Sequence, residues 1–161
     1  MCLGIILVAT SDLAGCGGSS DGGGDAGAGG TSATAFNEVY SCDQGGTCVD
    51  QNVMDSFMFE VLGNGTAQTV EGGQVIFSGP FSVATGAFGP FSGNGCGAAN
   101  PCNETGTWTF VDTDSDGTFD SFSGASSYTY TQSSGGGNCV TAGNGDPAPA
   151  PASPGPVGAC P

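Results

Sequence analysis

Four aspartates lie within nine residues of this chain, at Asp112, Asp114, Asp116 and Asp120. The 161 residues include no Lys, Arg or His but fifteen Asp and Glu, which gives a formal net charge of −15. Two like charges ~4 Å apart repel by about 1 kcal/mol in water and by about 4 kcal/mol at an effective dielectric of about 20. No side chain of this protein can offset that repulsion. We therefore expect the neutralising charge to come from outside the chain.

Residues 112–120 read DTDSDGTFD, which resembles the DxDxDGxxD calcium loop of EF-hands, dockerins and thrombospondin type 3 repeats. The resemblance implies that Ca²⁺ is bound by four carboxylates and one backbone carbonyl: Asp112, Asp114, Asp116, Asp120 (directly or through water) and the Thr118 carbonyl. Ser123 stands where an EF-hand carries its bidentate Glu, and the flanking residues alternate as strands do. We therefore expect a loop between two strands that is stabilised by Ca²⁺. An Asp-Gly hairpin turn without an ion is the alternative.

The residue inventory excludes most enzyme chemistry. Without His, Lys or Arg there is no Ser-His-Asp or Cys-His system, no Schiff base and no phosphate clamp. Nucleic acid is excluded as a partner for the same reason, because its phosphates are bound by Lys and Arg. Paired carboxylates remain for glycoside hydrolysis, with the candidates Glu38, Glu60, Glu71 and Glu104. Their spacing selects no pair, and acids on a β surface are usually solvated, so we predict a protein that is not an enzyme.

Six cysteines follow residue 16: Cys42, Cys48, Cys96, Cys102, Cys139 and Cys160. An even count in an exported chain predicts three disulfides. Five residues separate Cys42 from Cys48, and five separate Cys96 from Cys102, so each pair brackets a turn-forming loop. We predict these two local bridges and a third between Cys139 and Cys160, out of fifteen possible pairings.

The N-terminal residues predict export. Residues 1–15 read as a signal peptide with a short apolar core. The sequence Leu13-Ala14-Gly15-Cys16 resembles a bacterial lipobox, which implies that Cys16 carries a lipid and becomes the mature N-terminus. Gly17 after this cysteine favours the outer membrane or cell surface, and secretion without an anchor is the alternative. The rest of residues 16–35 is rich in Gly, Ser and Asp, and we expect it to form a disordered linker.

Residues 36–145 predict an all-β domain, because their apolar residues recur with a period of two. Phe57, Phe59 and Val61 share one strand face, and the pairs Asn64-Gly65 and Gly72-Gly73 mark chain reversals. Six to eight short strands of this kind predict an antiparallel meander closed into a small sandwich or barrel. Residues 146–161 contain six of the nine prolines and are expected to form a polyproline II spacer.

The combined prediction is a lipid-anchored protein that faces the cell surface or periplasm, with a Ca²⁺-stabilised, disulfide-stapled β domain. Its role would be binding or envelope structure, and its partners would be the membrane, through the anchor, and a surface protein or a further copy of itself. The alternative is a subunit of an extracellular filament or matrix, assembled through the apolar N-terminal segment or an unpaired edge strand.

Overall fold

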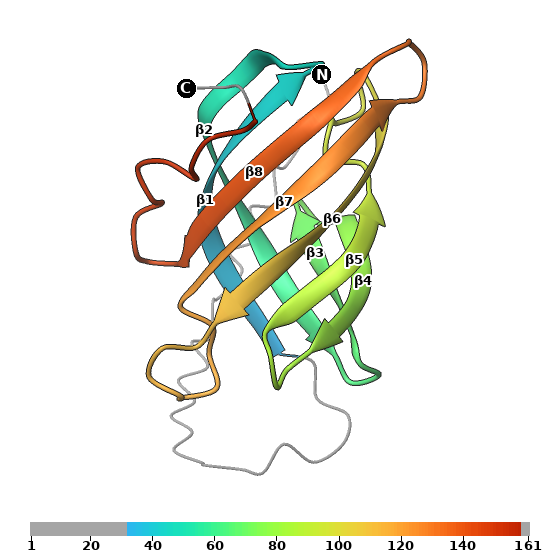
Figure 1. Cartoon of the computed structure of the whole chain (residues 1–161). Coiled ribbons are helices and arrows are strands. Elements are labelled where there is room, and N and C mark those ends of the chain that lie inside the picture. Colours follow the sequence, from blue (N-terminus) through green and yellow to red (C-terminus); the bar gives the residue numbers. More distant parts are fainter. Residues whose placement is uncertain (1–31, 159–161) are drawn as a thin grey trace, which may run out of the picture.

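A computed structural model describes residues 32–158, which form eight antiparallel strands closed into a barrel (Figure 1). Each strand pairs with the next in sequence, and the last pairs with the first. This confirms the predicted all-β meander and selects the barrel over the sandwich. The strands are β1 (Ser32–Gln44), β2 (Thr47–Leu62), β3 (Thr66–Glu71), β4 (Gln74–Ser82), β5 (Ala87–Gly93), β6 (Cys102–Val111), β7 (Ser121–Tyr130) and β8 (Gly136–Gly145).

Side chains alternate between the inside and the outside of the barrel along each strand. Phe57 and Phe59 are 4% and 1% exposed and point into the barrel, whereas Met58 between them is 37% exposed. The predicted reversals fall between strands, Asn64-Gly65 after β2 and Gly72-Gly73 after β3. The first strand starts at Ser32, four residues before the expected domain boundary. Because β1 and β8 pair along their length, the described barrel presents no unpaired edge strand.

The interior divides into an aromatic half and a polar half. One buried cluster is almost wholly aromatic: Phe36, Phe57, Phe59, Phe77, Phe81, Phe88, Phe91, Trp108, Phe110 and Phe122, with Ala67. Glycine makes room for the indole, since a Cβ at Gly124 would lie 2.3 Å from Trp108 Cδ1. Beyond Trp108 the inward-facing residues become acids, tyrosines and cystines. The polar half is the part of the barrel that calls for a functional explanation.

Of the three predicted disulfides, one is confirmed and two are wrong. Cys96 and Cys102 are joined as predicted, but Cys42 is joined to Cys139. Cys42 and Cys139 are direct partners in the β1–β8 ladder, with Cα atoms 4.1 Å apart. Cys48 lies opposite Asp43 in the β1–β2 ladder and is itself disulfide-bonded. The predicted Cys42–Cys48 and Cys139–Cys160 bridges are therefore wrong, because strand register and not sequence distance sets the pairing.

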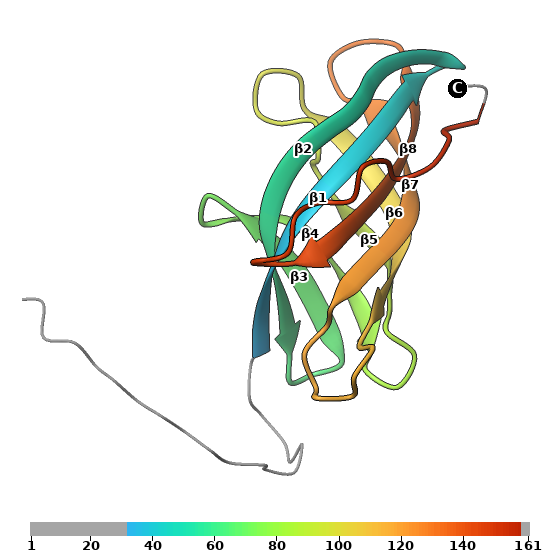
Figure 2. The ribbon, with the colours of Figure 1, turned by 90° about the vertical axis from the view of Figure 1, so that its left-hand side faces the viewer.

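The proline-rich segment is packed against the barrel and is not a free spacer over residues 146–158. The Asp146 amide donates to the Ala35 carbonyl at 2.9 Å, and Asn37 Nδ2 donates to the Ala148 carbonyl at 2.8 Å. Figure 2 shows the segment lying across β1. Val157 near its end is 1% exposed, as is Val39 on β1. The segment is thus a cover for the outer face of β1. The described residues include no helix that could span a membrane.

Candidate functional site

A cavity of about 220 Å³ occupies the polar half of the barrel interior. We call it the acidic chamber, because five carboxyl side chains line it: Glu38, Asp50, Asp55, Glu71 and Glu104. Its lining residues lie toward the end of the barrel that carries the β1–β2, β3–β4, β5–β6 and β7–β8 connections. Three tyrosines and the Cys42–Cys139 disulfide also line the chamber; the tyrosines are Tyr40, Tyr128 and Tyr130.

Strand alternation places these acids inside. Glu38 follows the inward-facing Phe36 by two residues, and Asp55 precedes Phe57 by two. Glu104 precedes Trp108 by four residues on β6, so it shares the same face. Glu38 and Glu104 are only 6% and 7% exposed. The expectation that these glutamates would be solvated is therefore wrong for both of them.

Three of the acids come together on neighbouring strands. Glu38 on β1 and Asp55 on β2 are direct cross-strand partners. Glu38, Asp55 and Glu71 each offer a carboxylate oxygen, and these oxygens lie within 4.8 Å of one another, so the group could hold a metal ion. Like charges directly opposite each other destabilise a strand pair. We call this group the acid triad.

Burial raises the pKa of two triad members, Glu38 and Glu71. It raises the pKa of Glu38 to about 8, against an ordinary value of 4.5, and the charges of Glu71, Asp55 and Glu104 add to the rise. The Thr141 hydroxyl, which donates to Glu38 Oε2 at 3.0 Å, opposes that rise. Burial, with the charges of Asp55 and Glu104, raises the pKa of Glu71 to about 7. Protonation is the means by which the chain itself relieves the repulsion, since it has no base.

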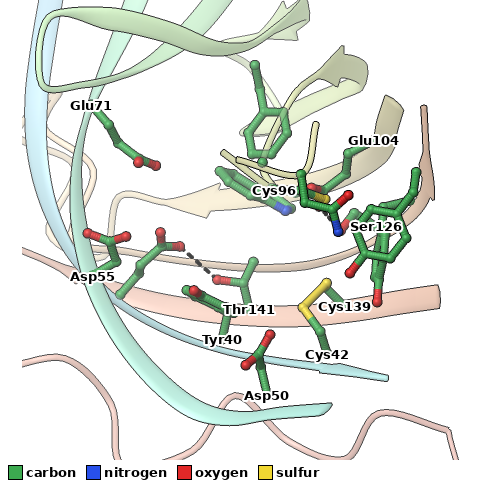
Figure 3. A pocket seen from close by; sticks show the side chains of 17 residues that line it. Tyr40, Cys42, Asp50, Asp55, Glu71, Cys96, Glu104, Ser126, Cys139 and Thr141 are labelled. Carbon is green, nitrogen blue, oxygen red and sulfur yellow. Dashed lines mark hydrogen bonds between the residues drawn. A yellow bond between two sulfur atoms is a disulfide. The ribbon is translucent and has the colours of Figure 1, made fainter. Parts of the chain in front are cut away.

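Glu104 lies on the opposite side of the chamber from the triad. Figure 3 shows Glu104 beside Ser126, across the cavity from Glu71 and Asp55. The Ser126 hydroxyl donates to Glu104 Oε1 and fixes the orientation of this carboxyl group. Burial raises the pKa of Glu104, and the hydrogen bond from Ser126 partly opposes the rise. A ligand in the chamber would therefore meet carboxyl groups on two facing walls.

Trp108 contributes an unused donor to the same cavity. Its side chain is 5% exposed, and its Nε1 has no hydrogen-bond partner among the described residues. Its aromatic ring neighbours are all phenylalanines, which offer no acceptor, and its side chain also lines the chamber. A buried indole N–H usually finds an acceptor.

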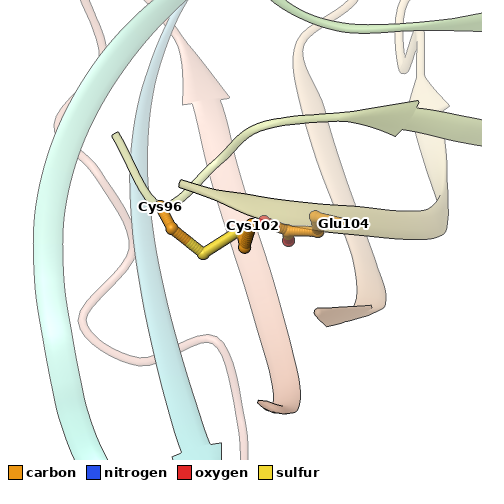
Figure 4. A group of neighbouring side chains, drawn as sticks. All are labelled: Cys96, Cys102 and Glu104. Carbon is orange, nitrogen blue, oxygen red and sulfur yellow. A yellow bond between two sulfur atoms is a disulfide. The ribbon is translucent and has the colours of Figure 1, made fainter. Parts of the chain in front are cut away.

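A third acidic grouping at the chamber has no metal-binding capacity of its own. Figure 4 shows Cys96, Cys102 and Glu104 next to one another. The two sulfur atoms are joined in a disulfide, so neither is a thiolate ligand. Glu104 alone remains, and a single carboxylate does not make a metal site.

The predicted calcium loop lies at the opposite end of the barrel, between β6 and β7 as expected. One carboxylate oxygen from each of Asp112, Asp114 and Asp116 lies within 4.8 Å of the other two. Asp112 is held by two backbone amides, those of Ser115 at 2.7 Å and Gly117 at 2.9 Å. The loop therefore brings together three of the predicted carboxylates.

The remaining predicted ligands of the loop are placed differently. Asp120 Oδ2 accepts a hydrogen bond from the Thr113 amide at 2.6 Å and does not belong to the group of three. The Thr118 amide donates to Asp116 Oδ1 at 2.7 Å. Ser115 and Gly117 have positive φ angles of 62° and 89°, which gives the loop its sharp turns. Asp114 and Asp116 are exposed.

Several predicted features fall outside the chamber or outside the described residues. Glu60 lies on the outer face of β2, where it accepts a hydrogen bond from Gln68 at 2.7 Å. Cys16 and Cys160 lie outside the described residues. The sequence reading missed Asp55 altogether. Strand alternation could have identified it. Asp55 is an even number of residues from Phe57 and Phe59 and so shares their inward face, whereas Glu60 is an odd number away and does not.

Comparison with known proteins gives no match: no protein-family model, no curated protein and no solved structure matches the chain. The site must therefore be interpreted from its own chemistry.

Proposed function

We propose that this protein is a non-enzymatic binding protein whose acidic chamber takes up a small, positively charged ligand. The observation that carries the proposal is the burial of Glu38 and Glu104 in a chain that has no basic residue. Buried carboxyl groups are costly unless they are paired, and perturbed acids in a cavity mark functional sites more often than structural ones. A cation from outside is the partner that these acids lack.

The shape of the chamber supports a binding role. Closed eight-stranded barrels have an interior wide enough for side chains or for one small ligand. Here the aromatic half is filled by rings, and the polar half keeps a cavity of about 220 Å³. Its walls combine carboxyl groups with Tyr40, Tyr130 and Trp108. Aromatic faces attract cations as carboxylates do, so both kinds of wall favour the same ligand charge.

The binding of a cation is tested by following unfolding and Trp108 fluorescence during titration. Ca²⁺, Mn²⁺, putrescine and choline are compared at constant ionic strength with NaCl as the control. A ligand of the native state raises stability by RT ln(1 + [L]/Kd), about 2.7 kcal/mol at a hundred times Kd. We expect a saturable rise with at least one cation, and its loss in Glu104→Gln or Glu71→Gln. A protein that none of the four cations stabilises would contradict the proposal.

We also propose that Ca²⁺ binds the loop at Asp112, Asp114 and Asp116 and stabilises that end of the barrel. The support is the convergence of three carboxylate oxygens and the pinning of Asp112 by two amides. Asp114→Asn is expected to lose part of the Ca²⁺-dependent rise in melting temperature, with Glu60→Gln as the matched control. An equal Ca²⁺-dependent rise in melting temperature in the wild type and Asp114→Asn would mean that the loop is a turn that does not bind Ca²⁺.

The proposed location is the exterior of a bacterial cell, with Cys16 lipidated. Two disulfides indicate an extracellular or otherwise oxidising compartment. The lipobox-like sequence before Cys16 carries the anchor itself. Labelling with a palmitate analogue and mapping of the mature N-terminus test the anchor. A mature protein that starts at another residue and carries no lipid would exclude it.

Glycoside hydrolysis is the second candidate function, because the fold brings three of the four candidate glutamates into one cavity. Glu38 and Glu71 face Glu104 across the chamber, and Glu60 is left outside. Hydrolysis by two carboxyl groups requires a separation of about 5 to 9.5 Å around the scissile bond. A panel of aryl glycosides distinguishes the candidates. A binding protein releases no aglycone, whereas turnover that Glu104→Gln abolishes would replace binding by catalysis.

A further inference from the structure

The acid triad is a place where the fold holds three acids together instead of separating them. Glu38 and Asp55 are direct partners in the β1–β2 ladder, and Glu71 reaches the same point from β3. A shift by one residue at any of these positions would point the acid outward. Thr141 fixes one oxygen of Glu38 from β8. Such support of a carboxylate by a neighbouring hydroxyl is typical of metal ligands.

Trp108 gives an independent indication of a ligand in the same cavity. Its Nε1 lacks an acceptor among residues 32–158, and its side chain lines the chamber. A bare metal ion would not satisfy this donor, but a water bound to the ion would. The chamber of about 220 Å³ is larger than an ion needs and has room for several coordinated waters.

The ligand atoms decide which ion the triad would take. The triad offers carboxylate oxygens only, and the sulfur atoms near the chamber are in disulfides. Hard cations prefer such oxygen sets, and Ca²⁺ tolerates irregular coordination with several waters, whereas Mg²⁺ demands near-octahedral geometry. A divalent ion also offsets more of the charge of the chamber acids than one ammonium group does.

We propose that the acid triad of Glu38, Asp55 and Glu71 binds a Ca²⁺ ion inside the barrel, with waters in the chamber completing its coordination. One of these waters accepts the hydrogen bond from Trp108 Nε1. This site is separate from the loop of Asp112, Asp114 and Asp116, which lies at the other end of the barrel. The inference rests on the proposed function, since it names the ligand class of the acidic chamber.

The test uses the full chain and separates the two sites by mutation. The background variant Asp114→Asn/Asp116→Asn disables the loop, so that remaining binding reports the chamber. Calorimetric titration with Ca²⁺ should then give one site, and Glu71→Gln or Asp55→Asn in this background should weaken it at least ~10-fold. Glu60→Gln on the outer face of β2 is the matched control and should leave the affinity unchanged. Circular dichroism and melting curves of each variant show that it is folded.

Terbium luminescence locates the ion relative to the indole. Trp108 is the only Trp of the chain, so excitation of the indole sensitises Tb³⁺ bound nearby. In the loop-disabled background we expect sensitised emission that Ca²⁺ displaces and that Trp108→Phe diminishes, while Trp108→Phe still binds Ca²⁺ by calorimetry. Calorimetric affinity that is equal in Glu71→Gln, Asp55→Asn and their background would overturn the proposed site.

The outcomes also separate this inference from the function on which it rests. If putrescine or choline binds the chamber and Ca²⁺ does not, the binding function stands and the metal site is wrong. If neither Ca²⁺ nor the organic cations bind, both are wrong. If Ca²⁺ binds the wild type but not the loop-disabled variant, the ion belongs to the loop alone and the inference fails.

Discussion

Glu38 and Asp55 show how strand register can bring two acids together. They face each other in the β1–β2 ladder, where opposite charges or apolar pairs would stabilise the sheet. The chain instead places two acids there and adds Glu71 from the next strand. It supplies no base anywhere. The arrangement makes chemical sense when a cation from outside completes it.

Glu104 gives a pH dependence with a definite sign. Burial raises its pKa above the ordinary 4.5, so the folded state holds this proton more tightly than the unfolded state. The resulting contribution to stability is full below pH 4.5 and is lost as the pH rises through the raised value. Glu104→Gln carries no such proton. Its stability relative to the wild type should therefore increase as the pH rises above 4.5 and through the raised pKa.

Urea unfolding at several pH values, with chelator present, measures this difference. The titratable groups that share the chamber with Glu104 are the same in both proteins: Glu38, Tyr40, Asp50, Asp55, Glu71, Tyr128 and Tyr130. Glu60→Gln, which alters an acid outside the barrel, should keep the wild-type profile. Parallel profiles for Glu104→Gln and the wild type would mean that Glu104 titrates as an ordinary surface acid.

At the level of elements, the disulfide between β1 and β8 secures the closure of the barrel. It joins residues 97 apart, whereas the Cys96–Cys102 bridge spans only 6. Chain-entropy arguments give about 4.7 kcal/mol for a closed loop of that length and about 2 kcal/mol for the short one. We expect Cys42→Ala/Cys139→Ala to lower the midpoint of urea unfolding more than Cys96→Ala/Cys102→Ala does. Equal losses would show that closure does not depend on this bridge.

The segment after β8 provides a second test at this scale. Val157 is 1% exposed although it lies within the proline-rich residues. Removing two buried methyl groups should cost about 1 to 3 kcal/mol, so we expect Val157→Ala to lower the free energy of unfolding by that amount. Val83→Ala is the control, because Val83 is 70% exposed. If both variants unfold like the wild type, the segment does not contribute to stability.

The strands could be predicted from the sequence because alternation of apolar residues is a local signal. Phe57 and Phe59 share one strand face as predicted, and both are buried. The chamber could not be predicted so readily, since an acid at an inward position resembles an acid at an outward one until the parity of the whole strand is followed. The Cys42–Cys139 bridge was beyond local reasoning, because it depends on which strand closes the barrel.

At the scale of the whole molecule, the barrel separates two acidic features by an aromatic core. The loop between β6 and β7 lies at the end where β1 begins, and the chamber lies toward the end where β1 finishes.

A crystal structure with Mn²⁺ or Tb³⁺ in place of Ca²⁺ tests the central claim most directly, since the anomalous signal marks the ion. The prediction is a peak inside the barrel within coordination distance of carboxylate oxygens of Glu38, Asp55 and Glu71, which is about 2.3 to 2.6 Å for Ca²⁺ itself. A peak at Asp112, Asp114 and Asp116 would support the calcium loop independently. A chamber that holds neither an ion nor an organic cation at saturating concentration would contradict the account.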